Sequence, residues 1–166
     1  KSFLSFVKKS SKICLFIYML QTNMINLKRK SILITGGTGS FGKSFVKYLL
    51  KQKYKFERIV IFSRDELKQH EMRESEDYNE KKYKNLRFFI GDIRDKDRLN
   101  HAFRNIDYII HAAALKQVPT GEYNPFEVIN TNVIGTQNIL DVALNSNDAK
   151  KIITLSTDKA VSPINL

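Results

Sequence analysis

The sequence predicts an α/β protein built on a doubly wound parallel sheet. Five short apolar runs, rich in β-branched residues, alternate with stretches of helical periodicity, which is typical of strands joined by crossover helices. The first run ends directly in three glycines with the spacing G-x-x-G-x-x-G. Because crossovers of this kind are right-handed, all the strands are expected to lie parallel in one sheet.

The stretch from Ile32 to Gly42 (ILITGGTGSFG) combines the first strand with the glycine turn. Gly36 lets the chain turn sharply, Gly39 leaves room for a phosphate, and Gly42 lets the following helix lie close to the strand. Free N–H groups in the first turn of that helix suit an anion. We therefore expect a strand, turn and helix that bind the pyrophosphate of a dinucleotide, as in a Rossmann domain.

The other elements follow in order along the chain. Helical periodicity predicts helices over 40–52 and 125–144, and Asp65 and Asp95 can cap two more that end near residues 78 and 103. The remaining strands are expected at 58–63, 86–90, 107–111 and 151–156. One face of the long helix carries Phe126, Ile129, Val133, Leu140 and Leu144.

Composition limits the classes of function. The single cysteine, Cys14, allows no internal disulfide and favours a reducing, cytoplasmic setting. The net charge is +11, but residues 1–30 hold seven basic and no acidic residues, so the rest has 21 basic against 17 acidic, or +4. Without a basic groove interleaved with aromatic residues, nucleic-acid binding is not expected.

Residues 1–29 form a basic and apolar extension ahead of the predicted domain, which covers 30–166. Its apolar run, 13–20, is too short to span a bilayer and precedes no small-residue cleavage site. Three interpretations compete: a membrane-surface anchor, a degenerate signal, or sequence upstream of a true start near Met24. We favour the last, which implies no firm membrane association. The chain stops ten residues after the fifth strand, so the domain is expected to be C-terminally truncated and to lack a sixth strand.

Five loop motifs together resemble one family. They are TGGTGSFG at 35–42, SRDELK at 63–68, GDIRD at 91–95, HAAALKQVP at 111–119 and STDKA at 156–160. They resemble extended short-chain dehydrogenases/reductases, specifically the UDP-N-acetylglucosamine 4,6-dehydratase (inverting) branch and its polysaccharide-biosynthesis relatives. The resemblance covers the N-terminal, cofactor-binding part of such an enzyme.

The end of the second strand predicts which dinucleotide binds. Ser63 and Arg64, with Lys68 one helical turn on, suit the 2′-phosphate of NADP, whereas an acid at this point would suit the free 2′-hydroxyl of NAD. Asp65 comes one place late and is better positioned to cap the helix. Similar dehydratases use NADP, so the resemblance implies NADP in preference to NAD.

The resemblance also supplies the rest of the cofactor site. Asp92 would hold the adenine amine and Ile93 would lie against the ring, while small side chains at 112–114 leave room near the nicotinamide ribose. His111 is expected to be a core residue, and Asn132 and Gly135 structural support. No metal is expected. The remaining predicted cofactor residues are Gly36, Thr38, Gly39, Ser40, Phe41, Gly42, Ala112, Ala113 and Ala114.

The STDKA motif is predicted to carry the chemistry. A 4,6-dehydratase needs a general acid and a general base close together, which adjacent Asp158 and Lys159 can provide. By resemblance, Asp158 protonates the leaving hydroxyl at carbon 6, Lys159 acts at carbon 5, and Thr157 binds near the oxygen on carbon 4. The implied enzyme is an NADP-dependent hydro-lyase that converts UDP-N-acetylglucosamine to a UDP-4-keto-6-deoxy-hexosamine for surface polysaccharide or flagellin glycan synthesis.

Two alternatives remain open. Relatives with the same Thr-Asp-Lys motif are also assigned as UDP-sugar 4-epimerases, and the chain could be a non-catalytic NADP-binding fragment. Relatives continue into a Tyr-x-x-x-Lys pair immediately after the sequence at 163–166 (PINL), where this chain stops. We therefore expect the 166-residue chain alone to be inactive, and the full-length enzyme to be a cytoplasmic homo-oligomer.

Overall fold

A computed structural model describes residues 27–51, 55–79 and 81–156. The described part contains one five-stranded, all-parallel sheet in the order β3-β2-β1-β4-β5. This arrangement confirms the predicted doubly wound fold. The strands are β1 (Ser31–Thr35), β2 (Arg58–Ser63), β3 (Leu86–Ile90), β4 (Tyr108–His111) and β5 (Lys151–Thr154).

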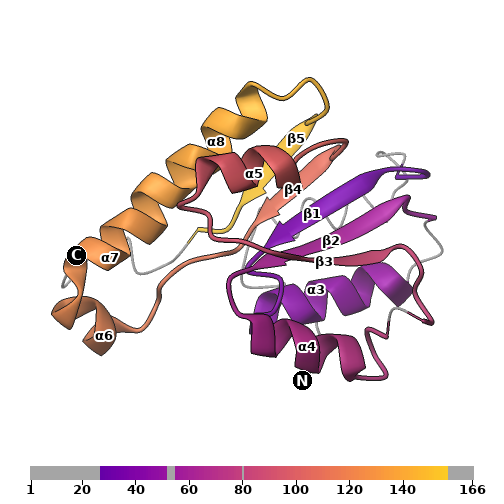
Figure 1. Cartoon of the computed structure of the whole chain (residues 1–166), viewed down its shortest axis with the longest axis horizontal. Helices are drawn as coiled ribbons and strands as arrows, with labels where there is room; N and C mark the ends of the chain where they lie inside the picture. The colour runs from indigo at the N-terminus through magenta and orange to yellow at the C-terminus, as the bar shows by residue number, and fades with distance from the viewer. Residues whose placement is uncertain (1–26, 52–54, 80, 157–166) are drawn as a thin grey trace.

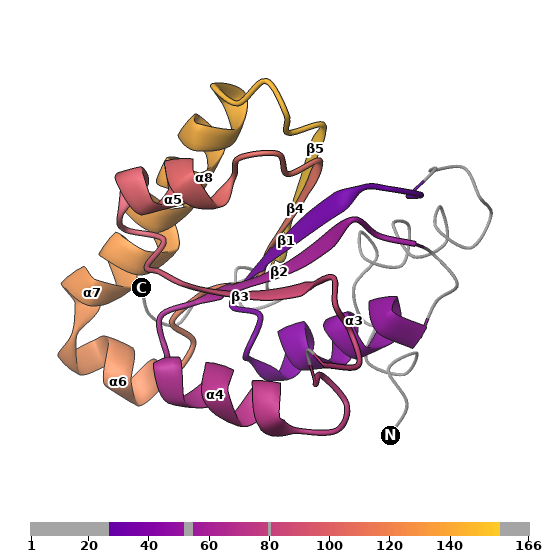
Figure 2. The ribbon, with the colours of Figure 1, turned by 45° about the vertical axis from the view of Figure 1, so that its right-hand side comes forward.

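Helices cover both faces of the sheet (Figures 1 and 2). On one face lie α3 and α4, and on the other lie α5 and α8. The short helix α6, in the connection after β4, was not predicted. The bounds are α3 (Ser40–Lys51), α4 (Glu66–Glu74), α5 (Lys96–Ala102), α6 (Val118–Tyr123), α7 (Pro125–Ile129), the π-helix η1 (Asn130–Ile134) and α8 (Gly135–Leu144).

Side chains alternate along the strands and so build two cores. Ile32 and Ile34 of β1 face α3, where Phe45 and Leu49 are buried against them. Leu33, between them, faces the opposite core, which it shares with residues of α5 and α8. The three inner strands, β1, β2 and β4, are therefore buried along almost their whole length, as expected when a parallel sheet is covered on both faces.

The helix boundaries follow local chemistry. Asp65 and Asp95 cap α4 and α5 as predicted, each accepting a backbone hydrogen bond of 2.9 Å from the residue three positions on. Helix α4 ends at Glu74 rather than near 78, because Ser75 turns to an extended conformation. Leu27, which falls within the predicted extension, is buried in the core, so packing begins a few residues before residue 30.

The long helix differs from its prediction in the face that it packs. A π-helical turn interrupts it, where the Gly135 amide donates to the Asn130 carbonyl five residues back. The buried side carries Thr131, Gly135, Ile139, Val142 and Ala143. Four of the five apolar residues predicted on one face are instead exposed: Phe126, Ile129, Val133 and Leu144. Both the predicted and the buried residues recur at about 3.6-residue spacing, so spacing alone does not select the packed side.

The strand order reverses beside β1. The chain moves outward from β1 to β2 and β3, then returns to place β4 on the other side of β1. Thr35 and His111, the last residues of β1 and β4, are paired in the sheet register. Loops from neighbouring strands therefore diverge at this carboxyl edge, which is where open α/β sheets bind ligands.

Candidate active site

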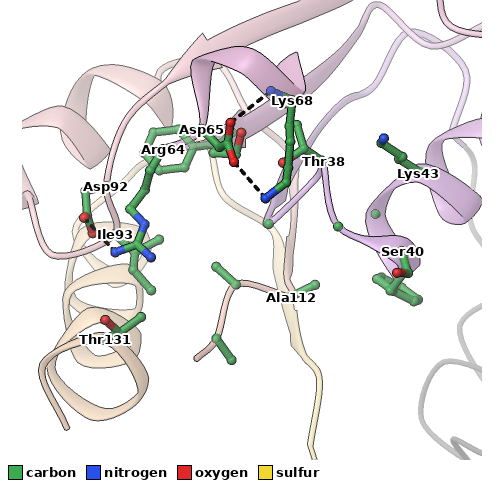
Figure 3. A pocket seen from close by; sticks show the side chains of 18 of the residues that line it. Thr38, Ser40, Lys43, Arg64, Asp65, Lys68, Asp92, Ile93, Ala112 and Thr131 are labelled. Atoms are coloured by element: carbon green, nitrogen blue, oxygen red, sulfur yellow. Dashed lines mark hydrogen bonds and ion pairs between the residues drawn. The ribbon is translucent and has the colours of Figure 1, made fainter. Parts of the chain in front are cut away.

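A cavity of about 790 Å³ opens at the carboxyl edge of the sheet (Figure 3). The loops after β1, β2, β3 and β4 all contribute to it. All fourteen residues predicted to hold the cofactor line this one cavity, although their individual roles remain predictions. Sequence analysis missed seven further lining residues: Lys43, Phe62, Asp65, Glu71, Gly91, Lys116 and Thr131.

The glycine turn forms one wall because larger residues would not fit. Gly36 has φ +64, and a Cβ there would lie 2.8 Å from the Ala112 carbonyl oxygen. A Cβ on Gly42 would come within 2.5 Å of the Gly37 backbone. By contrast, a Cβ on Gly39 would meet only the Gly36 carbonyl, at 3.2 Å. Gly36 and Gly42 are therefore required by the fold, whereas the space beside Gly39 is open for a ligand.

Cations and acids are paired in the loop after β2. The Lys68 ammonium lies 2.8 Å from Asp65 Oδ2, and this bond helps to hold the pKa of the Asp65 carboxyl below its ordinary value. Arg64 extends the other way, with Nη1 3.5 Å from Asp92 Oδ2. Figure 3 shows Arg64 on the side of Asp92, and Lys68 on the side of Thr38. The two predicted phosphate ligands thus border the cavity from different directions.

Asp92, after β3, is held by a residue that sequence analysis did not select. Its Oδ2 accepts bonds of 3.0 and 2.8 Å from the Arg94 guanidinium, and its Oδ1 accepts from the Arg94 amide at 2.9 Å. Burial raises the pKa of Asp92, but the bonds from Arg94 outweigh it and lower the pKa overall. Arg94 also donates to Glu127 of α7 at 2.6 Å. Asp92 is therefore a fixed carboxylate at the cavity wall.

The loop after β4 is fixed through the side chain of Thr35. The amides of Ala112 and Ala113 both donate to Thr35 Oγ1, at 3.2 and 3.3 Å. The same hydroxyl lies 2.7 Å from Nδ1 of His111. Since its acceptor capacity is used by two amides, the Thr35 proton points to His111, which makes Nδ1 the acceptor.

His111 is a core residue, as expected. It is 3% exposed, and its Nε2 lies 3.0 Å from Thr136 Oγ1. Thr136 donates its own proton to the Asn132 carbonyl at 2.7 Å, so His111 must donate to Thr136 from Nε2. Burial lowers the pKa of His111 to about 4. The imidazole is therefore neutral, with its proton on Nε2.

Asn132 and Gly135 support the site as predicted, although Asn132 is half-buried rather than buried. The Asn132 amide donates to the Leu115 carbonyl at 2.9 Å and accepts from the Leu115 amide at 2.8 Å. A Cβ on Gly135 would lie 2.7 Å from Ile93, which lines the cavity. Asn132 thus holds the loop after β4 and Gly135 leaves room for Ile93, a residue of the cavity lining.

The predicted catalytic residues Thr157, Asp158 and Lys159 lie outside the described residues. The chain leading to them is described as far as residue 156, and the Leu155 amide donates to the His111 carbonyl at 3.0 Å. The described residues contain no cluster that would hold a metal ion. Among the helices described, none has the length and apolar character needed to cross a membrane.

Comparison with known sequences assigns this arrangement to a family. The family model described as "Polysaccharide biosynthesis protein" matches residues 32–166. The chain belongs to this polysaccharide biosynthesis protein family. The match includes every loop that borders the cavity, together with the STDKA motif.

Curated proteins similar to this chain include some with different enzyme names. A protein of Campylobacter jejuni subsp. jejuni serotype O:23/36 (strain 81-176), named UDP-N-acetylglucosamine 4,6-dehydratase (inverting), is 56% identical over 137 residues. A Rickettsia typhi protein named UDP-glucose 4-epimerase is 49% identical over 138 residues. Each alignment covers 82% of this chain and 39% of the relative. The chain thus spans about two fifths of the length of the relatives that it matches.

Solved structures of similar proteins share the fold. Pen from Bacillus thuringiensis superposes with a TM-score of 0.76 at 42% identity, over 84% of this chain and 41% of that one. The UDP-glucose 4-epimerase of Bifidobacterium longum, solved with NAD+ and UDP, gives a TM-score of 0.66 at 25% identity, over 80% and 38%. These likenesses confirm the Rossmann-type architecture and the predicted resemblance.

Proposed function

We propose that this chain is the NADP-binding part of a nucleotide-sugar 4,6-dehydratase that acts on UDP-N-acetylglucosamine. The observation that carries the proposal is the cavity, in which the glycine turn, the Ser63–Arg64 pair, Asp92 and the small residues 112–114 meet. The 56% identity to a protein named as this dehydratase supports the choice of reaction. Because the chain spans only part of its relatives, the activity is proposed for a protein that contains this chain.

Charge at the cavity favours NADP over NAD. Lys43, Arg64 and Lys68 all border it, and Lys43 also lies on the glycine-turn side in Figure 3. Asp65, one of three acids in the lining, already caps α4 and pairs with Lys68, so it is poorly placed to accept from a free ribose hydroxyl. A 2′-phosphate would instead gain charge-assisted bonds from the cations.

NADP, when bound, supplies the hydride acceptor and donor for the sugar. The chain's own contribution to acid–base chemistry is proposed at the STDKA motif. Asp158 protonates the hydroxyl that leaves carbon 6, Lys159 moves the proton at carbon 5, and Thr157 binds the oxygen on carbon 4. Elimination requires such an acid–base pair, and Asp158 and Lys159, neighbours in the sequence, supply a carboxyl group that can donate a proton and an amine that can accept one.

Epimerisation at carbon 4 is the second candidate, because relatives such as the Rickettsia typhi protein carry that name. A simple epimerase needs no group that expels the hydroxyl at carbon 6. The Asp158–Lys159 pair therefore favours dehydration.

The proposal also includes that the full-length enzyme is a cytoplasmic homo-oligomer.

Incubation of a purified protein containing this chain with UDP-N-acetylglucosamine in deuterated water tests the reaction. The expected product has lost one water by mass spectrometry and carries deuterium at carbon 5. Asp158→Asn should abolish water loss, whereas Asp97→Asn, on the exposed surface of α5, should not. Formation of the 4-epimer with no loss of water would replace dehydratase by epimerase.

A further inference from the structure

Gln69 of α4 is a buried polar residue that does not line the cavity. It is 2% exposed. Its amide nitrogen Nε2 lies 3.0 Å from Ser63 Oγ, 3.1 Å from the Ser63 carbonyl oxygen and 3.1 Å from the Phe89 carbonyl oxygen. The side chain thus joins the end of β2 to β3 directly behind the predicted phosphate site.

The partners of Gln69 fix which end of its amide faces Ser63. The carbonyl oxygens of Ser63 and Phe89 can only accept, so the nitrogen must face them. An amide nitrogen of this kind only donates. The oxygen of the Ser63 hydroxyl therefore faces the N–H protons of Gln69. The hydroxyl proton of Ser63 has no acceptor on that nitrogen and points elsewhere.

The Ser63 hydroxyl proton is consequently available to a ligand in the cavity that Ser63 lines. The oxygens of an ionised phosphate only accept, and a hydrogen bond to a charged group is stronger than one between neutral groups. A ribose hydroxyl is neutral and gains less from the same donor. An aspartate at this position would offer the opposite polarity, because it could only accept.

We propose that Gln69 is a positioning residue that orients the Ser63 hydroxyl as a donor, and thereby favours a dinucleotide with a phosphate on its adenosine ribose. The inference rests on the proposed NADP site and deepens it. Gln69 would influence which cofactor binds without touching that cofactor. Its hydrogen bonds to two carbonyls would keep the donor polarity independent of the ligand.

Binding titrations of NADPH and NADH with the whole chain test this role. The ratio of the NADH dissociation constant to the NADPH dissociation constant measures the preference for NADPH. This ratio is expected to fall about tenfold in Ser63→Ala, since a bond to a charged group is lost. In Gln69→Met it should fall roughly threefold or more, because the hydroxyl is no longer oriented. The double variant should fall no further than Ser63→Ala, since the two residues act through one bond.

Gln137→Met is the matched control. Gln137 is an exposed glutamine of α8 whose Nε2 donates to Asp141 at 2.7 Å, so its loss should leave the ratio unchanged. Gln69→Leu provides a second apolar replacement if the methionine variant does not fold. Equal weakening of NADPH and NADH in a folded Gln69 variant would overturn the inference and assign Gln69 a purely structural role. A wild-type protein with no preference for NADPH would remove the proposed cofactor, and the inference with it.

Discussion

The hydroxyl of Thr35 lies 2.7 Å from Nδ1 of His111, at the point where β1 and β4 end side by side. This contact joins the strand before the glycine turn to the strand before the loop at 112–116. Thr136 continues the connection into α8 from the other ring nitrogen. Each hydrogen bond in the series from Thr35 through His111 to Thr136 has a defined donor. This direction of donation requires an uncharged imidazole.

Protonation of His111 should therefore destabilise the fold. Its pKa is about 4 in the folded protein against 6.5 for an ordinary histidine, so the unfolded chain binds more protons between these values. Stability from this group is fully present above pH 6.5 and is lost as the pH falls toward 4, by up to about 3 kcal/mol. Urea denaturation of wild type and His111→Gln at several pH values would measure it. A His111→Gln protein with the same pH slope as wild type would contradict the prediction.

Asp65→Asn should strengthen NADPH binding. Asparagine caps helices about as well as aspartate, so α4 should remain intact. The change removes a negative charge from the cavity and releases Lys68 from its 2.8 Å ion pair. We expect NADPH affinity to rise about two- to fivefold, the range of an exposed ion pair, with little change for NADH. Weaker NADPH binding in a folded variant would mean that Asp65 assists the cofactor.

Arg64→Asp should weaken NADPH far more than NADH. The substitution replaces a charge-assisted partner of the proposed 2′-phosphate by a repulsive group, so a loss of about tenfold or more is expected for NADPH. Arg104→Asp, exposed and outside the cavity lining, makes the same charge change as a control. Parallel losses for both nucleotides in fluorescence titrations would exclude Arg64 from this role.

Alanine substitutions at Gly42 and Gly39 should have different effects, the first on stability and the second on dinucleotide binding. Alanine at Gly42 would meet the Gly37 backbone at 2.5 Å and should destabilise the protein by about 3 kcal/mol, as in overpacked cores. Alanine at Gly39 would meet only the Gly36 carbonyl at 3.2 Å, but would fill space proposed for the pyrophosphate. Gly39→Ala should thus melt near wild type yet bind dinucleotides poorly. Thermal melts with and without NADPH compare the two, and normal binding by Gly39→Ala would contradict the proposed site.

The sequence predicted those features that depend on neighbouring residues. The Asp65 cap needs only an acid three positions before a free amide, and residues 59–62 of the second strand are all apolar because the sheet is covered on both faces. The location of the cavity and fourteen of its lining residues were also predictable, since the parallel strands end at one edge. These features follow from local pattern and topology together.

Contacts between distant segments were not predictable in the same way. Arg94 reaches Glu127, 33 residues away, and nothing in the GDIRD motif indicates that partner. The long helix has two faces with helical spacing, and its sequence does not reveal that the side with Thr131, Ile139 and Val142 is the buried one. Gln69 was missed because a single glutamine in a charged helix gives no sign that tertiary packing will bury it.

The position of β1 between β2 and β4 has a consequence for how the domain folds. Ile32 pairs with Ile59 on one side and with Tyr108 on the other, so one neighbour lies 27 residues along the chain and the other 76. The nearer pairing requires a much shorter loop closure and is expected to form first. The cavity becomes whole only when the later pairing brings the loop after β4 against the glycine turn. Dinucleotide binding should therefore slow the separation of β4 from β1. The strands β1, β2 and β3 and the strands β4 and β5 should then unfold together in a single step.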